Sequence, residues 1–129
     1  MTSHPHFDDH GSLEWHTRFA DAKAAAAADG KKVFIEMGRE MCSNCRSLVS
    51  AVVPQPAIAK ALKADFVALA ADIDELEEPL RDLLMENMPD AMMLPFVVFT
   101  DAEGKWLTGL QGAVQPADFE RTVTELTSA

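Results

Sequence analysis

The hydrophobic and polar positions of the chain follow two alternating patterns. Nearly continuous apolar runs, typical of buried strands, cover 31–37, 66–72 and 95–100, and a turn at 101–104 leads into a returning strand over 105–110. Apolar residues at helical spacing predict helices between these strands and after them. The predicted helical segments are 12–29, 42–53, a short helix around 58–62, 74–87, and the segment after Pro116.

The order of these segments indicates the fold class. Helices and strands alternate up to the last two strands, which predicts an α/β protein with helices on both faces of a mixed sheet. The closing pair of strands adds an antiparallel hairpin at the edge of that sheet. We therefore predict one domain over 12–129.

Residues 1–11 show no periodicity, and we predict a flexible N-terminal arm there. Its three histidines, His4, His6 and His10, suggest a metal site. However, nothing in the sequence fixes their geometry, so we expect a disordered polar terminus and no bound metal.

The charge of the chain narrows the class of partner. Lys and Arg number 11 against 21 Asp and Glu, which gives a formal net charge of −10. This excess argues against nucleic acid and anionic membranes as partners, and we expect a monomer. No run approaches a membrane span, and the first ten residues lack the apolar core of a signal peptide. The expected location is cytoplasmic, or periplasmic if a leader has been removed.

The chemistry of the chain centres on its two cysteines, Cys42 and Cys45. A zinc site needs about four ligands, and a structural disulfide usually closes a longer loop. A dithiol that cycles between the reduced and oxidised forms fits better, because the pair lies where a strand leads into a helix. Helical spacing directs Cys45 inward and places Cys42 at the helix start, where free amide groups favour a thiolate. Cys42 is therefore the expected nucleophile and Cys45 the resolving thiol.

Glu36 interrupts the first apolar strand. A carboxylate inside a buried strand is costly unless it has a partner or a task. A bend that lets Glu36 reach water is the structural alternative.

The order of these motifs resembles the thioredoxin superfamily over about 12–127. The chain is most similar to the branch that contains the C-terminal domain of the bacterial transmembrane thiol:disulfide interchange protein and its small soluble relatives. The resemblance rests on the strand and CxxC motif at 33–45, the strand at 66–74, the proline loop and hairpin at 94–105, Gly112, and Trp15 at the start of a helix. It implies a thioredoxin-like three-layer α/β/α sandwich.

The family resemblance also implies roles for individual residues. Pro95 would be a cis-proline facing the disulfide, and the backbone of Leu94 would pair with an extended substrate peptide. Glu36 would be the buried acid that serves as general base for Cys45. The implied function is thiol–disulfide oxidoreductase, with no cofactor. Its partners would be protein or peptide disulfides and a thiol–disulfide electron donor.

The chain departs from the family pattern at three places. Met41 precedes the motif where thioredoxins carry Trp, and Ser43-Asn44 separate the cysteines. Ala70 lies where the family often has a lysine beside the buried acid, so we expect Glu36 to lack a positive partner.

Methionines provide a further functional signal. Met41, Met92 and Met93 are expected to border Cys42, where they would form an adaptable apolar rim for substrates; Met37 and Met85 are expected to fill the core. A different interpretation is a Cu(I) carrier that uses Cys and Met sulfur. A non-catalytic binding domain is the third. Glu36 and Pro95 favour the exchange enzyme, because neither has a role in copper binding.

Overall fold

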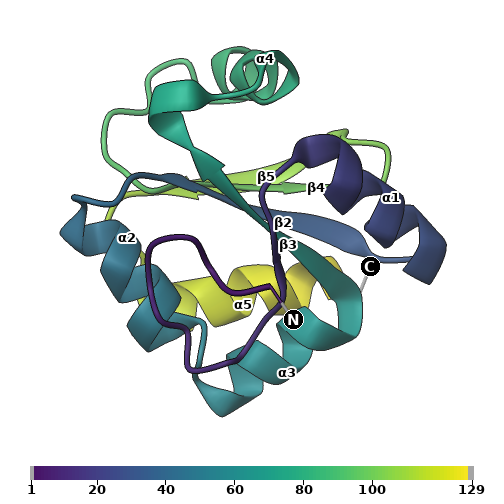
Figure 1. Ribbon diagram of the computed structural model, residues 1–129, viewed down its shortest axis with the longest axis vertical. Helices are drawn as coiled ribbons and strands as arrows, with labels where there is room; N and C mark the ends of the chain where they lie inside the picture. Colours follow the sequence, from purple (N-terminus) through teal and green to yellow (C-terminus); the bar gives the residue numbers. More distant parts are fainter. Residues whose placement is uncertain (1, 128–129) are drawn as a thin grey trace.

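A five-stranded mixed sheet forms the centre of the structure, a computed structural model that describes residues 2–127 (Figure 1). The strand order is β1-β3-β2-β4-β5. β1, β3 and β2 are parallel to one another, and β4 and β5 complete the sheet in antiparallel fashion. The strands are β1 (Trp15–His16), β2 (Lys32–Gly38), β3 (Phe66–Asp72), β4 (Phe96–Thr100) and β5 (Trp106–Gln111).

Helices cover both faces of this sheet (Figure 1). α1 (Phe19–Asp29) and α4 (Glu78–Asn87) lie on one face. The opposite face carries α2 (Ser43–Ser47), α3 (Pro56–Asp65) and α5 (Pro116–Thr127). The predicted three-layer α/β/α arrangement with a closing hairpin is confirmed. Within residues 2–127, no helix has both the length and the apolar character that crossing a bilayer requires.

β2 lies in the middle of the sheet and supplies both cores. Its alternate side chains point to opposite faces, as in any strand. Val33, Ile35 and Met37 pack in the core under α1 and α4. Phe34 packs on the other side, where its ring stacks on Phe99 at 5.5 Å between ring centroids. A strand buried on both faces must be apolar along its length, which explains the continuous run in the sequence.

The predicted helices are present with local interruptions. The helix after the motif changes at Leu48–Val52 into a π-helical turn, η1, just before Pro54. A 3-10 turn, η2 (Ile73–Glu75), precedes α4, which begins only at Glu78 with Pro79 in its first turn. Pro fits a first helical turn because that position needs no amide donor.

The predicted helical start at residue 12 is wrong. Trp15 belongs to β1, where it pairs with Ala68 of β3, and α1 begins at Phe19. The buried carboxylate of Asp9 explains the extended path, since it accepts hydrogen bonds from the Trp15 indole Nε1 (2.8 Å) and the Leu13 amide (2.9 Å). These bonds hold residues 9–15 in place and leave their apolar side chains facing the core.

The prediction of a flexible arm is also wrong for residues 2–11. His4, Phe7 and Asp9 are buried, and the Trp15 amide donates to the Thr2 carbonyl at 2.8 Å. Phe7 joins the same core as Phe34 and Cys45. The segment therefore packs on the domain predicted for 12–129. Residue 1 of the arm and residues 128–129 of that domain lie outside the described residues.

Candidate active site

The two cysteines lie where β2 leads into α2. β2 ends at Gly38, and Cys42 is the residue that caps the N-terminus of α2. The pair is joined in a disulfide with a Cα–Cα distance of 5.3 Å. The Cys45 amide donates to the Cys42 Sγ at 3.1 Å. This backbone N–H belongs to the first turn of the helix, where it has no carbonyl partner within the helix, and it points at the sulfur. It therefore favours negative charge on Cys42 once the disulfide is reduced.

The two sulfurs differ in their access to solvent. Cys45 is fully buried in the core between the sheet and the helices, whereas Cys42 is partly exposed at its edge. An attacking thiol must reach the substrate, and a resolving thiol needs to reach only its neighbour. The arrangement can therefore support attack from Cys42 followed by resolution from Cys45.

The proline loop packs next to the motif. The Leu94–Pro95 peptide is cis, as expected, and the Asn44 side chain donates to the Leu94 carbonyl at 3.3 Å. Cys42 and Leu94 pack against the same core cluster. The Gly112 amide donates to the carbonyls of Met93 (2.9 Å) and Pro95 (3.1 Å), which ties this loop to the end of β5.

Glu36 lies beneath the disulfide. It is a buried residue of β2, so the alternative of a strand bend that exposes it is wrong. A Cβ atom placed on Gly38 would lie 2.6 Å from the Cys45 Sγ and closer still to the Glu36 Oε2. The carboxylate oxygen and the sulfur therefore face each other across the space that the missing side chain of Gly38 leaves open.

Glu36 also has a partner that sequence reasoning missed. The His4 Nε2 and the Glu36 Oε1 are 2.7 Å apart, and both side chains are almost completely buried. Ala70 supplies no charged partner, as expected, and the carboxylate is paired instead with a histidine that the sequence analysis did not connect to it. The imidazole comes from the N-terminal segment and not from β3. Two features of the sequence could have indicated this contact: a buried acid with no evident partner, and three histidines in the N-terminal segment.

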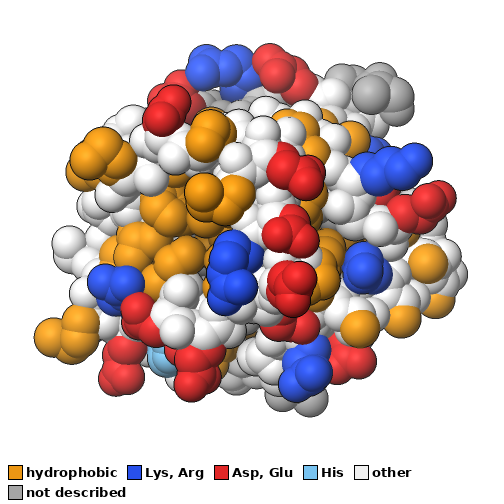
Figure 2. Space-filling model, turned by 90° about the horizontal axis from the view of Figure 1, so that it is seen from above, with side chains coloured by type: hydrophobic (Ala, Val, Ile, Leu, Met, Phe, Trp, Pro, Cys, Tyr) orange, Lys and Arg blue, Asp and Glu red, His pale blue; other side chains and the backbone are white. Residues whose placement is uncertain are grey.

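The methionines separate into exposed and buried sets. Met41 is 89% exposed, Met92 87% and Met93 58%, so the predicted rim residues are accessible. Met37 fills the core as expected, but Met85 is 59% exposed on α4, and that prediction is wrong. Hydrophobic side chains gather in the left half of Figure 2, the side on which α2 lies in Figure 1. Acidic and basic side chains border that area.

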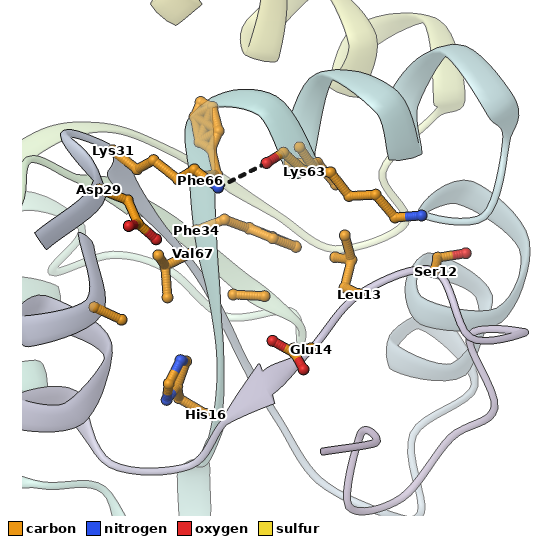
Figure 3. A pocket seen from close by; sticks show the side chains of 13 residues that line it. Ser12, Leu13, Glu14, His16, Asp29, Lys31, Phe34, Lys63, Phe66 and Val67 are labelled. Atoms are coloured by element: carbon orange, nitrogen blue, oxygen red, sulfur yellow. Dashed lines mark hydrogen bonds between the residues drawn. The ribbon is translucent and has the colours of Figure 1, made fainter. Parts of the chain in front are cut away.

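Two hollows lie at opposite ends of the parallel strands. One of about 330 Å³ reaches Glu36 and Gly38 and is also lined by His4, Ala70 and Asp72. The other lies beside Lys31, Phe34 and Phe66, at the beginning of β2 and β3, and the Lys31 ammonium donates there to the Lys63 carbonyl (Figure 3). Seven strand residues span roughly 20 Å, so the second hollow lies far from the motif. The first hollow reaches Glu36 and Gly38, and neither cysteine lines it. Within residues 2–127, no cluster of three or more His, Cys, Asp or Glu side chains is placed to hold a metal ion.

Comparison with protein families identifies the chain. A family model described as thioredoxin-like matches residues 14–102, which include β2, the CxxC motif and the cis-proline. The chain belongs to the thioredoxin-like family. A search of curated proteins finds no match.

Several solved structures are similar to the chain in fold. A thioredoxin from Thermus thermophilus is 24% identical, with a TM-score of 0.72 over 90% of this chain and 88% of that one. A poplar thioredoxin h is 18% identical, with a TM-score of 0.64 over 96% of each chain. A disulphide isomerase from Xylella fastidiosa Temecula1 is also 18% identical, with a TM-score of 0.62 over 84% of this chain and 87% of that one. At these identities the likeness shows the thioredoxin fold alone.

Proposed function

We propose that this protein is a thiol–disulfide oxidoreductase that acts on protein or peptide disulfides through Cys42 and Cys45. The observation that carries the proposal is the placement of the disulfide. One sulfur is accessible beside a cis-proline loop, and the other is buried opposite a carboxylate. A structural disulfide needs neither the accessible sulfur nor the facing acid.

Exchange would proceed in two steps. The Cys42 thiolate attacks one sulfur of the substrate disulfide; that S–S bond breaks, and the other substrate sulfur leaves as a thiolate. Cys45 then gives its proton to Glu36 and attacks the Cys42 sulfur. The Cys42–Cys45 bond forms as the second substrate thiolate leaves with the electron pair. The substrate gains two electrons, and a dithiol electron donor returns them to the protein.

Substrates would bind over the motif and the proline loop. The backbone of Leu94 would pair with an extended peptide, while Met41 and Met93 would contact its apolar side chains. The exposure of both methionine side chains supports this assignment. The Leu94 carbonyl accepts from Asn44 in the free protein, and its second lone pair can accept from a peptide N–H.

The experiment is reduction of a protein disulfide driven by dithiothreitol, with and without the protein. Wild-type protein should accelerate the reaction, and Cys42→Ser and Cys45→Ser should both abolish the acceleration. Met85→Ser, an exposed change on α4, is the matched control and should behave as the wild type. The Cu(I) carrier predicts tight Cu(I) binding by the reduced protein with poor turnover, and the non-catalytic binding domain predicts neither activity. Absence of acceleration in the wild type would reject the enzyme.

A further inference from the structure

We propose that His4 is a positioning residue for disulfide exchange, which holds Glu36 so that one carboxylate oxygen faces Cys45. This inference rests on the proposed function and assigns the N-terminal segment a part in it. The two side chains come from positions 32 residues apart and meet at 2.7 Å with almost no exposure to solvent. A buried carboxylate that loses a side-chain donor would reorient or be destabilised, so this contact affects the chemistry nearby.

The hydrogen bonds of the His4 ring define its tautomer. The Nδ1 atom accepts from the backbone amides of His6 (3.1 Å) and Phe7 (3.2 Å). A nitrogen that accepts carries no proton, so the proton of the neutral ring is on Nε2. His4 therefore donates through Nε2–H to the Glu36 Oε1. His4 is thus a neutral donor to the carboxylate, whereas a lysine at position 70 would supply a full positive charge.

This hydrogen bond gives the two carboxylate oxygens different roles. Oε1 is held by His4, while Oε2 faces the Cys45 sulfur across Gly38. During resolution, the Cys45 thiol transfers its proton to Oε2, and its electron pair attacks the Cys42 sulfur as the bond from Cys42 to the substrate breaks. The protonated acid still accepts from His4 at Oε1. The positioned oxygen is thus ready for the proton before the transfer and stays in place after it.

The ring itself is held firmly. It stacks on Phe7 at 5.3 Å, and Trp15 packs edge-on against it at 4.7 Å between ring centroids. Trp15 is in turn bonded to the buried Asp9. Ala70 pairs with Glu36 in register and lines the same hollow as His4, so its short side chain leaves space for the imidazole.

The test separates attack from resolution. Reduced protein is mixed with a small aromatic disulfide, 5,5′-dithiobis(2-nitrobenzoate), and release of the coloured thiolate is followed by stopped flow. The first equivalent reports attack by Cys42, and the second reports resolution by Cys45. His4→Phe keeps the ring shape and removes the donor, so the second phase should slow by roughly tenfold or more while the first phase stays unchanged.

Two variants and a double mutant control for indirect effects. His4→Gln restores an N–H donor at a reach similar to that of Nε2 and should recover most of the second phase. His6→Gln changes an exposed ring two residues away and should leave both phases as in the wild type. In a Glu36→Gln background, His4→Phe should slow resolution little further, because the carboxylate it positions is absent.

A wild-type second phase in folded His4→Phe would overturn the inference, and so would equal slowing of both phases. The proposed function would survive either result; it fails if the wild type releases only one equivalent and no Cys42–Cys45 disulfide forms. If His4→Phe does not fold, ¹⁵N spectra of the wild-type imidazole decide the question. A proton on Nε2 is expected, and a proton on Nδ1 would overturn the proposal.

Discussion

Gly38 makes room for the sulfur of Cys45: a Cβ atom on Gly38 would lie 2.6 Å from the Cys45 Sγ. The same atom would collide with the Glu36 carboxylate, so glycine is required for the acid and the thiol to face each other. Gly38 does not have a positive φ, and the reason for glycine is therefore the close approach of side chains and not backbone strain.

Gly38→Ala should separate the acid from the thiol. Overpacking in a buried site costs about 1–3 kcal/mol, and we expect the free energy of unfolding to fall by that amount. The resolving step should slow as well. Gly109→Ala is the matched control, because its Cβ would crowd Trp106 and Met88, which lie outside the CxxC motif. Denaturant unfolding should show a lower free energy of unfolding for both variants. Stopped-flow exchange should show a slower resolving step for Gly38→Ala alone. Equal exchange rates would contradict this account.

Only Cys42 should react with iodoacetamide in the native, reduced protein near neutral pH. Cys45 is fully buried, whereas Cys42 is partly exposed and receives an amide hydrogen bond. Brief alkylation followed by peptide mass spectrometry measures the ratio of the two products. Unfolded protein, in which both thiols are accessible, provides the control. Equal labelling of the folded protein would reverse or remove the assigned roles.

The sequence predicted the sheet better than the segment before it. Continuous apolar runs mark β2, β3 and β4, because nearly every side chain of a strand that is buried on both faces must be apolar. Trp15 fits the spacing of the helix that follows, and a local pattern cannot show that its indole donates to Asp9. The β1 pairing with Ala68 is likewise a contact between distant parts of the chain.

The site shows the same division. Cys42, Cys45 and Pro95 are identified by residue type and order, and Glu36 by its conflict with an apolar strand. His4 could not be identified in this way. Its role depends on how residues 2–11 fold, and the sequence of that segment shows no periodicity from which the fold could be predicted. Phe7 was the one large apolar residue in that segment, and its burial brings His4 into the core.

Asp9→Ala should destabilise the fold by about 1–3 kcal/mol, because it leaves the buried Trp15 indole without its acceptor. Asp8→Ala alters an exposed neighbour and should change stability by no more than about 0.5 kcal/mol. Denaturant midpoints measure both. A midpoint for Asp9→Ala equal to that of Asp8→Ala would show that the packing of the N-terminal segment contributes little to stability.

Met41→Ser combined with Met93→Ser should raise KM for an extended peptide disulfide by roughly tenfold, since the apolar contacts of the rim would be lost. Turnover of a small aromatic disulfide and thermal stability should stay at wild-type values, because both side chains are exposed. Met85→Ser, also exposed, is the control outside the rim. An unchanged KM would remove Met41 and Met93 from the proposed substrate surface.

Glu36→Gln tests the acid itself. The glutamine Oε1 can accept the same hydrogen bond from His4, and a neutral amide avoids the burial of a charge, so stability at neutral pH should equal or exceed that of the wild type. The resolving step should slow by about 10²–10⁴-fold, because the amide cannot take the Cys45 proton. Attack by Cys42 should be unaffected. Glu36→Ala is the contrasting variant: it leaves His4 without an acceptor and should lose about 1–3 kcal/mol of stability. A Glu36→Gln protein that is destabilised and exchanges at the wild-type rate would make Glu36 a structural residue.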